Sequence, residues 1–370
     1  MTEGTAIMTP VRTYDLARGE LRPEILDEFA LPFDVDDLLR RGFNYVDRRG
    51  STTLRSAFVL RVGKVAHEVE ATLVAHGALG ALDLALRAWP VPARRLLCLA
   101  PTYREALTIA RSNGLAPVEI PRCGQEIDVE WVRRNGRPGD EVYIVPTLNN
   151  PDGFTLTAQA RHRLAEAIAA GGAGLVEDDA YGPLAEDFGE LPSVVAALLQ
   201  VAPDRPAVRL TSFSKLVMPG ARICVVEGAP LMIAQLDAAK ADFGTSPLAS
   251  AFVEQILADE QCWQATLTAV RGRLVRGLAA ARAELAAWPL PVRYPFGGYF
   301  LWLPTGDVDP TAFRADTAGS IGVAVADGSV FYPGQPSGNH VRLSTAWESP
   351  ERVAQGCAAI RDKWIQRVGG

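Results

Sequence analysis

Lysine is scarce in this sequence. Only Lys64, Lys215, Lys240 and Lys363 are lysines, so 33 of the 37 basic residues are arginines. An arginine cannot replace a lysine as a nucleophile, because its guanidinium group stays protonated in proteins. Any reaction that needs a free amine therefore has few candidate residues in this chain.

Residues that commonly bind metal ions are also few and scattered. The five cysteines form no C-x-x-C pair, and the four histidines share no ligand spacing with one another or with the cysteines. We therefore expect no metal site, and the cysteines fit reduced, mostly buried thiols of a cytoplasmic protein. These residues are Cys98, Cys123, Cys224, Cys262 and Cys357, and His67, His76, His162 and His340.

The sequence also lacks the usual features of membrane, secreted and nucleic-acid-binding proteins. No apolar run approaches the ~18 residues that a membrane-spanning helix needs. Residues 1–8 show no basic region followed by an apolar core, so we expect no secretion signal. The formal net charge of -6 argues against a nucleic-acid partner. The composition is that of a globular protein, and 370 residues favour two closely packed domains.

Short β-branched runs alternate with helical patterns in the middle of the chain, which is typical of an α/β layer with a mainly parallel sheet. The predicted strands are residues 95–100, 142–145, 174–177, 208–211 and 223–226, and the predicted helices are residues 80–89, 103–113 and 158–170. After Ser246-Pro247 the pattern changes. It predicts one long helix over residues 249–284, strands over 298–303 and 340–344, and a closing helix over 350–367.

The run from Thr211 to Arg222 carries the clearest indication of chemistry. It joins Lys215 to two hydroxyls, a Pro-Gly bend and Arg222. A lysine in a desolvated or cationic setting can form a Schiff base with a carbonyl, and the arginine and the serines suit phosphate oxygens. The alternative is a strand that ends in a turn with a solvated lysine. The apolar runs on both sides favour the first interpretation.

Other polar and aromatic residues follow the predicted strands, at the ends where open α/β sheets bind ligands. Gly77 opens a helix, and a glycine at a helix start allows close approach of an anion, although such a pattern is more often a tight turn. Asn150 lies in a turn with proline and glycine. Asp178 and Tyr181 form a D-x-x-Y pattern, for which the alternative is an acidic loop that caps a helix.

Together these motifs resemble those of fold-type I, pyridoxal-phosphate-dependent aminotransferases of the class I/II group. The similarity is greatest to the subgroup with S-K-x-x-x-P-G-x-R spacing, and it runs from about Tyr14 to the last helix. It implies a large domain with a mainly parallel seven-stranded sheet between helices, plus a smaller α+β domain. The implied division is an N-terminal segment at the active-site edge (1–44), the cofactor-binding domain (45–247), and a linking helix with the small C-terminal domain (248–370).

The resemblance also implies the roles of individual residues around pyridoxal 5'-phosphate. Lys215 would form the Schiff base, Asp178 would pair with the pyridine nitrogen, and Tyr181 would bond the ring hydroxyl oxygen; these three are the implied catalytic residues. Asp179 is expected to be a solvated neighbour. The implied cofactor-binding residues are Gly77, Ala78, Leu79, Tyr103, Asn150, Asp178, Tyr181, Ser212, Ser214, Lys215, Arg222 and Tyr45, and the implied substrate-binding residues are Arg342, Gly19 and Asn150.

The chain departs from the family pattern at three places. Ala78-Leu79 stands where relatives commonly carry polar side chains, Asp152 replaces a threonine, and Cys224 replaces a glycine. The run from Tyr45 to Arg55 resembles a family segment whose tyrosine reaches the neighbouring subunit's phosphate, which implies a homodimer with shared active sites.

The implied activity is transfer of an amino group between an L-amino acid and a 2-keto acid. The same scaffold also hosts lyases, β- or γ-replacement and cyclising enzymes, and oxidases, and no residue named above separates these from transamination. A third possibility is a non-catalytic regulator, because aminotransferase-like domains occur fused to DNA-binding domains. The acidic composition and the enzyme-like start of the chain disfavour it.

Overall fold

The computed structural model describes residues 13–29, 34–90, 95–123 and 126–368. Residues 1–8, on which the expectation about a secretion signal rests, lie outside this range. In the part of the chain that is described, no helix is both long enough and apolar enough to cross a membrane.

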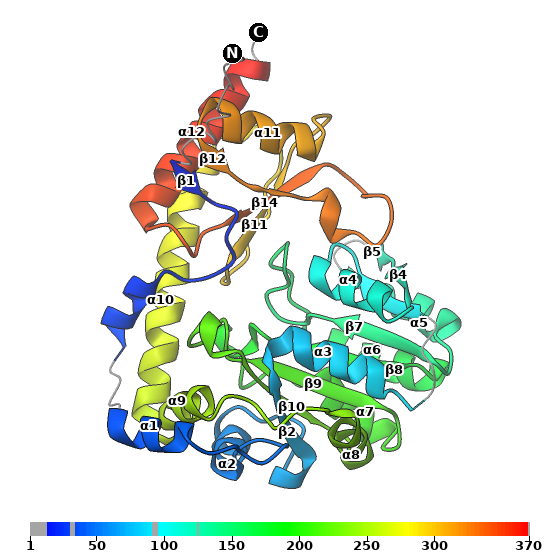
Figure 1. The fold of residues 1–370 in the computed structure, drawn as a ribbon. Coiled ribbons are helices and arrows are strands. Elements are labelled where there is room, and N and C mark those ends of the chain that lie inside the picture. Colours follow the sequence, from blue (N-terminus) through cyan, green and yellow to red (C-terminus); the bar gives the residue numbers. More distant parts are fainter. Residues whose placement is uncertain (1–12, 30–33, 91–94, 124–125, 369–370) are drawn as a thin grey trace, which may run out of the picture.

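A seven-stranded sheet forms the centre of the larger part of the molecule (Figure 1). Strand β10 runs antiparallel to both of its neighbours, and all other neighbouring strands are parallel. The mainly parallel sheet of the sequence prediction is therefore present. In spatial order the strands are β2 (Thr72–His76), β10 (Ile223–Gly228), β9 (Ala207–Ser212), β8 (Gly174–Asp178), β7 (Asp140–Ile144), β3 (Arg95–Leu99) and β4 (Ala116–Ile120).

Helices cover both faces of this sheet. Alternate residues of each strand point to opposite faces, so Leu96 and Tyr143 contribute to one buried cluster and Leu97 and Val142 to another. The first cluster contains residues of α3 (Gly77–Ala88), α4 (Arg104–Ser112) and α8 (Pro230–Ala239). The second contains residues of α5 (Val129–Asn135), α6 (Ala158–Gly171) and α7 (Val194–Val201). Burial on both faces explains why the strands read as continuous apolar runs.

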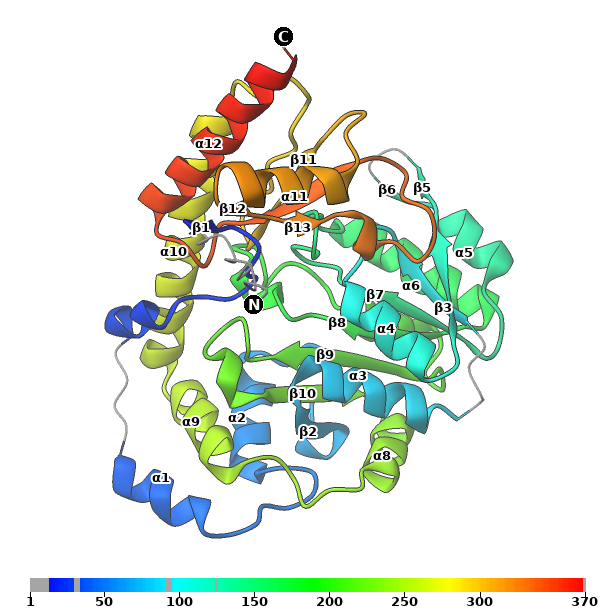
Figure 2. The ribbon, with the colours of Figure 1, turned by 45° about the horizontal axis from the view of Figure 1, so that its top comes forward.

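A smaller part is built around short strands and two long helices, α10 (Glu260–Leu285) and α12 (Pro350–Val368), which pack on each other. Its three-stranded antiparallel sheet has the order β11 (Phe300–Pro304), β14 (His340–Ser344) and β13 (Ala326–Asp327). Strand β1 (Tyr14–Asp15) pairs in parallel with β12 (Val323–Ala324), next to α11 (Pro310–Ser320). The N-terminal segment therefore reaches the C-terminal part of the chain (Figure 2).

The long helix predicted over residues 249–284 is in fact two helices, α9 (Pro247–Ala258) and α10, so this prediction is wrong. Asp259 between them has an extended backbone, and its carboxylate accepts hydrogen bonds from the backbone N–H groups of Gln261 and Cys262. An aspartate that caps a helix in this way favours a new helix start over a continuous helix.

The remaining predicted elements each overlap an observed helix or strand. Strands β2 and β4 were not predicted; β4 contains Pro117 and lies at the sheet edge, where the apolar pattern is weak. The α-helices and strands not yet described are α1 (Val35–Gly42), α2 (Thr52–Arg61), β5 (Arg122–Cys123) and β6 (Glu126–Ile127). The domain boundaries at residues 44/45 and 247/248 stay predictions.

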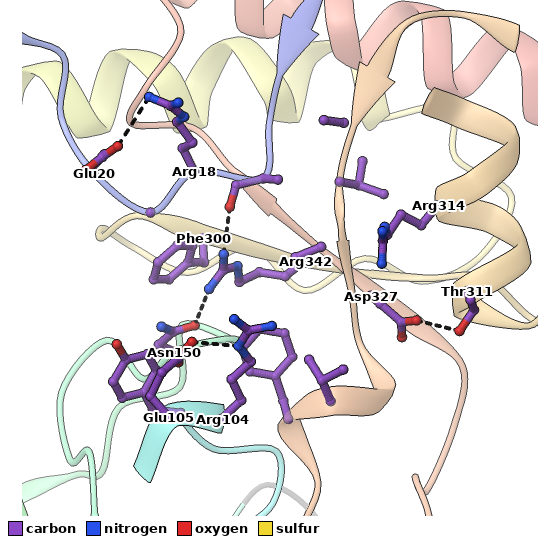
Figure 3. A pocket seen from close by; sticks show the side chains of 18 of the residues that line it. Arg18, Glu20, Arg104, Glu105, Asn150, Phe300, Thr311, Arg314, Asp327 and Arg342 are labelled. Atoms are coloured by element: carbon purple, nitrogen blue, oxygen red, sulfur yellow. Dashed lines mark hydrogen bonds and ion pairs between the residues drawn. The ribbon is translucent and has the colours of Figure 1, made fainter. Parts of the chain in front are cut away.

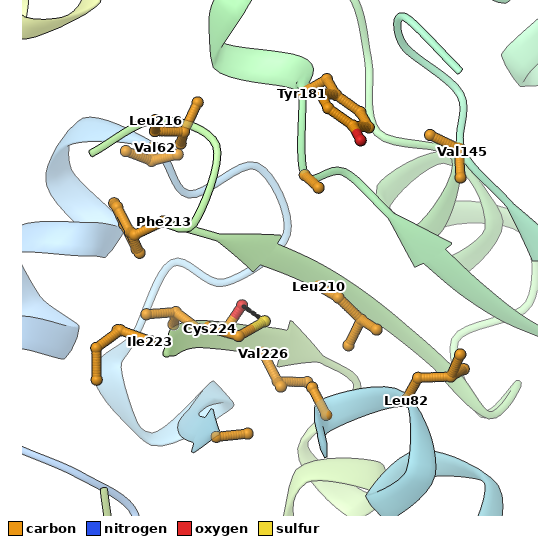
Figure 4. Packing of buried hydrophobic residues seen from close by; sticks show 14 of the residues in the cluster. Val62, Leu82, Val145, Tyr181, Leu210, Phe213, Leu216, Ile223, Cys224 and Val226 are labelled. Carbon is orange, nitrogen blue, oxygen red and sulfur yellow. Dashed lines mark hydrogen bonds between the residues drawn. The ribbon is translucent and has the colours of Figure 1, made fainter. Parts of the chain in front are cut away.

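The core directly beneath the carboxyl ends of β8 and β9 and the amino end of the antiparallel β10 is tightly filled. Leu210, Phe213, Cys224 and Val226 are fully buried (Figure 4). Tyr181 closes the same cluster from the loop after β8. Such close packing fixes the strand ends that carry the predicted site residues.

Candidate active site

Two adjoining cavities lie at the carboxyl ends of the central strands. The inner cavity has a volume of about 200 Å³, and the outer cavity has a volume of about 710 Å³ and extends to α11 and β13 (Figure 3). Of the predicted site residues, the inner cavity is lined by Ala78, Leu79, Tyr103, Asn150, Asp178, Tyr181, Ser212, Ser214, Lys215 and Arg222. Gly19 and Arg342 line the outer cavity, which shares Tyr103, Asn150, Tyr181 and Lys215 with the inner one.

Lys215 follows strand β9, and hydrogen bonds hold both its side-chain nitrogen and its backbone carbonyl oxygen. Its ammonium donates a hydrogen bond to the carbonyl oxygen of Gly19 at 2.5 Å, and the Tyr299 hydroxyl donates to the carbonyl oxygen of Lys215 at 2.7 Å. Burial, with smaller contributions from the cationic Arg342 and Arg222, lowers the pKa of Lys215 to about 8. A substantial fraction of this amine is therefore neutral in mildly alkaline solution, as a nucleophile or proton acceptor requires.

Asp178 is the last residue of β8, and its side chain is buried. The Tyr143 hydroxyl donates to Oδ2 at 2.8 Å, whereas Oδ1 has no hydrogen-bond partner among the described residues. Burial raises the pKa of Asp178 to about 6, although the hydrogen bond from Tyr143 opposes this shift. The group is mostly ionised at neutral pH, and its unpaired oxygen fits the protonated ring nitrogen of pyridoxal 5'-phosphate.

The opposite side of the inner cavity has the character of an anion site. Arg222 has a left-handed backbone (φ 51°) and donates from Nη1 to the Ser214 hydroxyl at 3.3 Å. Gly77 has φ 68°, and a Cβ atom there would lie 2.4 Å from Nη2 of Arg222. Glycine is therefore required both by the backbone and by the guanidinium beside it. Ala78 and Leu79 lie in the first turn of α3, whose N–H groups favour an anion.

Ser212 completes this side of the cavity, since its hydroxyl accepts a hydrogen bond from the backbone N–H of Ser214 at 3.3 Å. The residues present thus fit a phosphate with side-chain hydroxyls, one guanidinium and a helix start. Ala78 and Leu79 carry no polar side chain, so only their backbone N–H groups could contribute.

Arg342 on β14 faces the outer cavity from the smaller part of the molecule. It donates from Nη1 to Oδ1 of Asn150 at 2.8 Å and from Nη2 to the carbonyl oxygen of Ala17 at 2.7 Å. Its guanidinium carbon lies 4.3 Å from the centre of the Phe300 ring. Burial lowers the pKa of Arg342 to about 10, so it is a cation at neutral pH. These contacts fix the plane of a fork that suits a carboxylate.

Three further predicted residues, Gly19, Tyr181 and Tyr103, line one or both cavities. A Cβ atom on Gly19 would lie 2.8 Å from Cζ of Phe300, so this position has room only for glycine. The Tyr181 ring lies 5.6 Å from that of Tyr299 and 6.1 Å from that of Phe300. Tyr103 precedes α4 and lines both cavities.

Asp179 is not the solvated neighbour that the sequence suggested, because it is buried and ion-paired. Its Oδ2 accepts from Nη2 and Nε of Arg209 at 2.6 and 3.1 Å. Arg209 also donates to the buried Glu227, whose carboxylate accepts from the backbone N–H groups of residues 64–66. Sequence reasoning missed Arg209. The only signal was a charged residue within an otherwise apolar strand.

Glu177 caps a helix, as the alternative interpretation of this acidic run predicted. Its Oε2 accepts from the Ser193 hydroxyl at 2.6 Å and from the backbone N–H of Val195 at 2.9 Å, at the start of α7. Asp152 shapes the turn after β7, since it accepts from the Asn149 side chain and from Arg122.

Two predicted residues line neither cavity: Gly77, which lies beside Arg222, and Tyr45, which the single chain does not bring to the site. Tyr45 exposes 84% of its surface. Its ring lies 5.2 Å from that of Phe243, which is 76% exposed. Among the described residues, no cluster of three or more His, Cys, Asp or Glu side chains is placed to hold a metal ion.

Comparison with known proteins extends over nearly the whole chain. Residues 31–360 match the family model "Aminotransferase class I and II". The chain is 31% identical over 323 residues to the 2-aminoadipate transaminase of Thermus thermophilus, which covers 84% of this chain and 79% of that protein. It is 25% identical over 367 residues to an aromatic-amino-acid aminotransferase of Thermococcus litoralis, which covers 93% and 83%.

The fold is shared with solved structures. An α-aminoadipate aminotransferase from Thermus thermophilus, crystallised with N-(5'-phosphopyridoxyl)-L-leucine, superposes with a TM-score of 0.82 at 24% identity, over 98% of this chain and 94% of that chain. These relatives do not favour the lyase, replacement, cyclising or oxidase alternatives. The chain belongs to the class I and II aminotransferase family, and it is a fold-type I aminotransferase that uses pyridoxal phosphate.

Proposed function

We propose that Lys215 holds the cofactor covalently and also moves the proton in an amino-group transfer between an L-amino acid and a 2-keto acid. This assignment rests on one observation: a single cavity holds three features that each suit a different part of the cofactor. These are the Lys215 amine, the unpaired Oδ1 of Asp178, and the anion site at Ser214 and Arg222. They suit the aldehyde carbon, the ring nitrogen and the phosphate of pyridoxal 5'-phosphate.

When bound, the cofactor supplies an electron sink for the electron pair that is left when a proton leaves the substrate Cα. The protein's part is position and charge. Asp178 keeps the ring nitrogen protonated, while Arg222, Ser212, Ser214 and the start of α3 hold the phosphate. Asn150 and Tyr181 are proposed to bond the ring hydroxyl oxygen, and Tyr103 to stack on the ring.

Arg342 is proposed to bind the substrate α-carboxylate, with Asn150 and Ala17 fixing its orientation. This places the substrate Cα at the junction of the two cavities. Lys215 lies at the same junction, because it lines both cavities. A neutral Lys215 amine can then take the proton from Cα and return it on the other side of the reaction. Its lowered pKa makes that protonation change accessible near pH 8.

The test is the Lys215→Ala variant beside the wild-type holoenzyme. We expect the wild type to show an absorbance band that borohydride abolishes, and to release a 2-keto acid while it consumes a second one in equal amount. Lys215→Ala should lose the borohydride-sensitive band and turnover, because no other described lysine lines either cavity. Turnover at the wild-type rate in this variant would refute the assignment, and release of ammonia or peroxide would refute the transfer reaction.

We also propose a homodimer in which Tyr45 reaches the neighbouring subunit's phosphate. The support is an exposed aromatic cluster beside an open hollow of about 510 Å³. Phe43, Tyr45 and Phe243 are exposed by 89, 84 and 76%, which is unusual for large apolar side chains on a monomer. Sedimentation equilibrium should give twice the 39.7 kDa chain mass at micromolar concentration. A fully active monomer would contradict this proposal.

A further inference from the structure

A buried tyrosine outside both cavities, Tyr299, contacts the backbone of Lys215. Tyr299 comes directly before β11, and its hydroxyl donates to the carbonyl oxygen of Lys215 at 2.7 Å. Burial raises the pKa of Tyr299 above its usual range, so the hydroxyl keeps its proton and remains a donor. Tyr299 lines neither cavity, so it does not touch a substrate there. No step of the proposed function uses this hydroxyl.

The carbonyl oxygen of Lys215 depends on the Tyr299 hydroxyl. In the turn after β9, the carbonyl oxygen of Phe213 accepts from the backbone N–H groups of residues 216, 217 and 218 at 3.3, 2.9 and 3.2 Å. The carbonyl oxygen of Lys215 accepts from no backbone N–H group in the part of the chain that the structure describes, and the Tyr299 hydroxyl is its one partner there. A buried carbonyl without a partner is costly. The hydroxyl therefore fixes the backbone from which the Lys215 side chain extends.

Tyr299 is itself held by the smaller part of the molecule. Its carbonyl oxygen accepts from the backbone N–H of Thr345 at 2.9 Å. The next residue, Phe300, opens β11, which pairs with the strand β14 that carries Arg342. The Phe300 ring lies beside the Arg342 guanidinium (Figure 3). Two consecutive residues therefore contact the backbone of Lys215 and the guanidinium of Arg342.

We propose that Tyr299 is a positioning residue for the proton transfer, because its hydroxyl fixes the backbone of Lys215 relative to Arg342. The inference rests on the proposed function, since it takes Lys215 as the carrier of the Cα proton and Arg342 as the partner of the α-carboxylate. Arg342 determines where the substrate Cα lies, and the Tyr299 hydroxyl determines where the lysine side chain begins. Misplacement of a reacting group by about 1 Å can slow a reaction about 10²-fold. The hydroxyl therefore affects the rate of proton transfer more than it affects substrate binding.

The experiment removes the hydroxyl and keeps the ring. In single turnovers of the Tyr299→Phe holoenzyme, with an amino acid that the wild type converts, we would measure the limiting rate constant and the half-saturating substrate concentration. We expect the rate constant to fall by about 10–100-fold, and the half-saturating concentration to stay within about twofold of the wild type. With the α-deuterated amino acid, the isotope effect should be at least as large as in the wild type. A single turnover gives the rate constant separately from the fraction of active protein, so partial misfolding cannot imitate this result.

A second measurement needs no turnover. We would add pyridoxal 5'-phosphate to the unloaded protein, reduce samples with borohydride at successive times, and follow the mass of the peptide that contains Lys215. Capture by Tyr299→Phe should be slower than capture by the wild type, because it uses the same amine. Tyr294→Phe is the matched control for both measurements, since the Tyr294 hydroxyl has no hydrogen-bond partner among the described residues. It should equal the wild type in both.

An unchanged rate of Tyr299→Phe in either measurement would overturn the Tyr299 assignment while leaving the transfer reaction intact. A slower turnover with a smaller isotope effect, or a change confined to the half-saturating concentration, would overturn it as well, because the proton transfer would not be the step that the hydroxyl affects. The same loss in Tyr294→Phe would show that the contact with Lys215 is not the cause. A wild type that converts no amino acid would instead refute the proposed function.

Discussion

The two ends of the central sheet each hold a buried carboxyl group with an unpaired oxygen, and the two groups differ in what surrounds them. Asp178 ends β8 at the carboxyl end of the sheet, and Glu141 is the second residue of β7 at the amino end. Neither Oδ1 of Asp178 nor either oxygen of Glu141 has a partner among the described residues. Burial raises the pKa of Asp178 to about 6 and that of Glu141 to about 9.

The difference lies in the setting of each group. Asp178 lines the inner cavity and receives a hydrogen bond from Tyr143, which keeps its pKa low enough for ionisation at neutral pH. Glu141 lines neither cavity and receives no hydrogen bond from the described residues, so it stays protonated. An unpaired buried oxygen therefore indicates a ligand where it faces a cavity, and a cost in stability where it does not.

The largest expected effect is on the Asp178 side of this comparison. Asp178→Asn keeps a group that can accept the hydrogen bond from Tyr143 but removes the charge opposite the ring nitrogen. We expect the rate of the first half-reaction to fall by at least about 10²–10³-fold, as for loss of other preorganised charge in active sites. Single-turnover absorbance measurements at saturating cofactor would show it.

Glu141→Gln is the matched control, because it makes the same acid-to-amide change in the same sheet away from both cavities. Its half-reaction rate should equal that of the wild type. The comparison breaks down if Asp178→Asn reacts within about threefold of the wild type, or if Glu141→Gln slows the reaction as much.

A third buried charge set contains a cation shared by two carboxylates. Arg209 is fully buried and binds Asp179 and Glu227, so Arg209→Met would leave two buried carboxylates without their cation. We expect this to lower the free energy of unfolding by about 3–5 kcal/mol, the usual consequence of breaking a buried ion pair. Chemical unfolding of the purified protein would measure the loss.

The control for this prediction is Arg163→Met, which breaks an exposed pair with Glu126 at 3.7 Å. Exposed pairs contribute about 0–1 kcal/mol, so this variant should unfold almost as the wild type does. Equal stability of the two variants would show that the Arg209 charge set contributes no more than a surface pair.

The inner cavity could be predicted from the sequence because its residues lie in short contiguous motifs at strand ends. Lys215 and Arg222 belong to one run, and Asp178 and Tyr181 to another. The outer cavity could not be predicted in the same way. Its wall joins residues 17–20, α11 and β14, which are far apart in the chain.

The two errors of the sequence prediction have different origins. Asp179 looked solvated because its partner Arg209 is contributed by a different strand, 30 residues away. The helix over residues 249–284 looked continuous because no proline or glycine interrupts it at Asp259, where a side-chain cap alone starts α10. A contact between distant segments decided the first case and a local side-chain cap decided the second, and hydrophobic periodicity reports neither.

The last prediction concerns how the stability of Glu141→Gln depends on pH. The pKa of Glu141 is raised from its usual 4.5 to about 9, so between these values the folded protein holds a proton that the unfolded chain releases. The contribution of Glu141 to stability is therefore intact below pH 4.5 and is lost progressively as the pH rises towards 9. A glutamine mimics the protonated acid and removes this dependence.

We therefore expect Glu141→Gln and the wild type to have similar unfolding free energies at pH 5. The variant should be more stable by on the order of 4 kcal/mol at pH 8, since about three pH units separate the two conditions and each unit corresponds to about 1.4 kcal/mol. Chemical unfolding at several pH values would measure the difference, with exposed Glu166→Gln on α6 as the control that should show no pH-dependent gain. A constant difference between pH 5 and pH 8 would mean that Glu141 is ionised in the folded protein. In that case the contrast between the two ends of the sheet would rest on the cavity alone and no longer on the protonation states of the two acids.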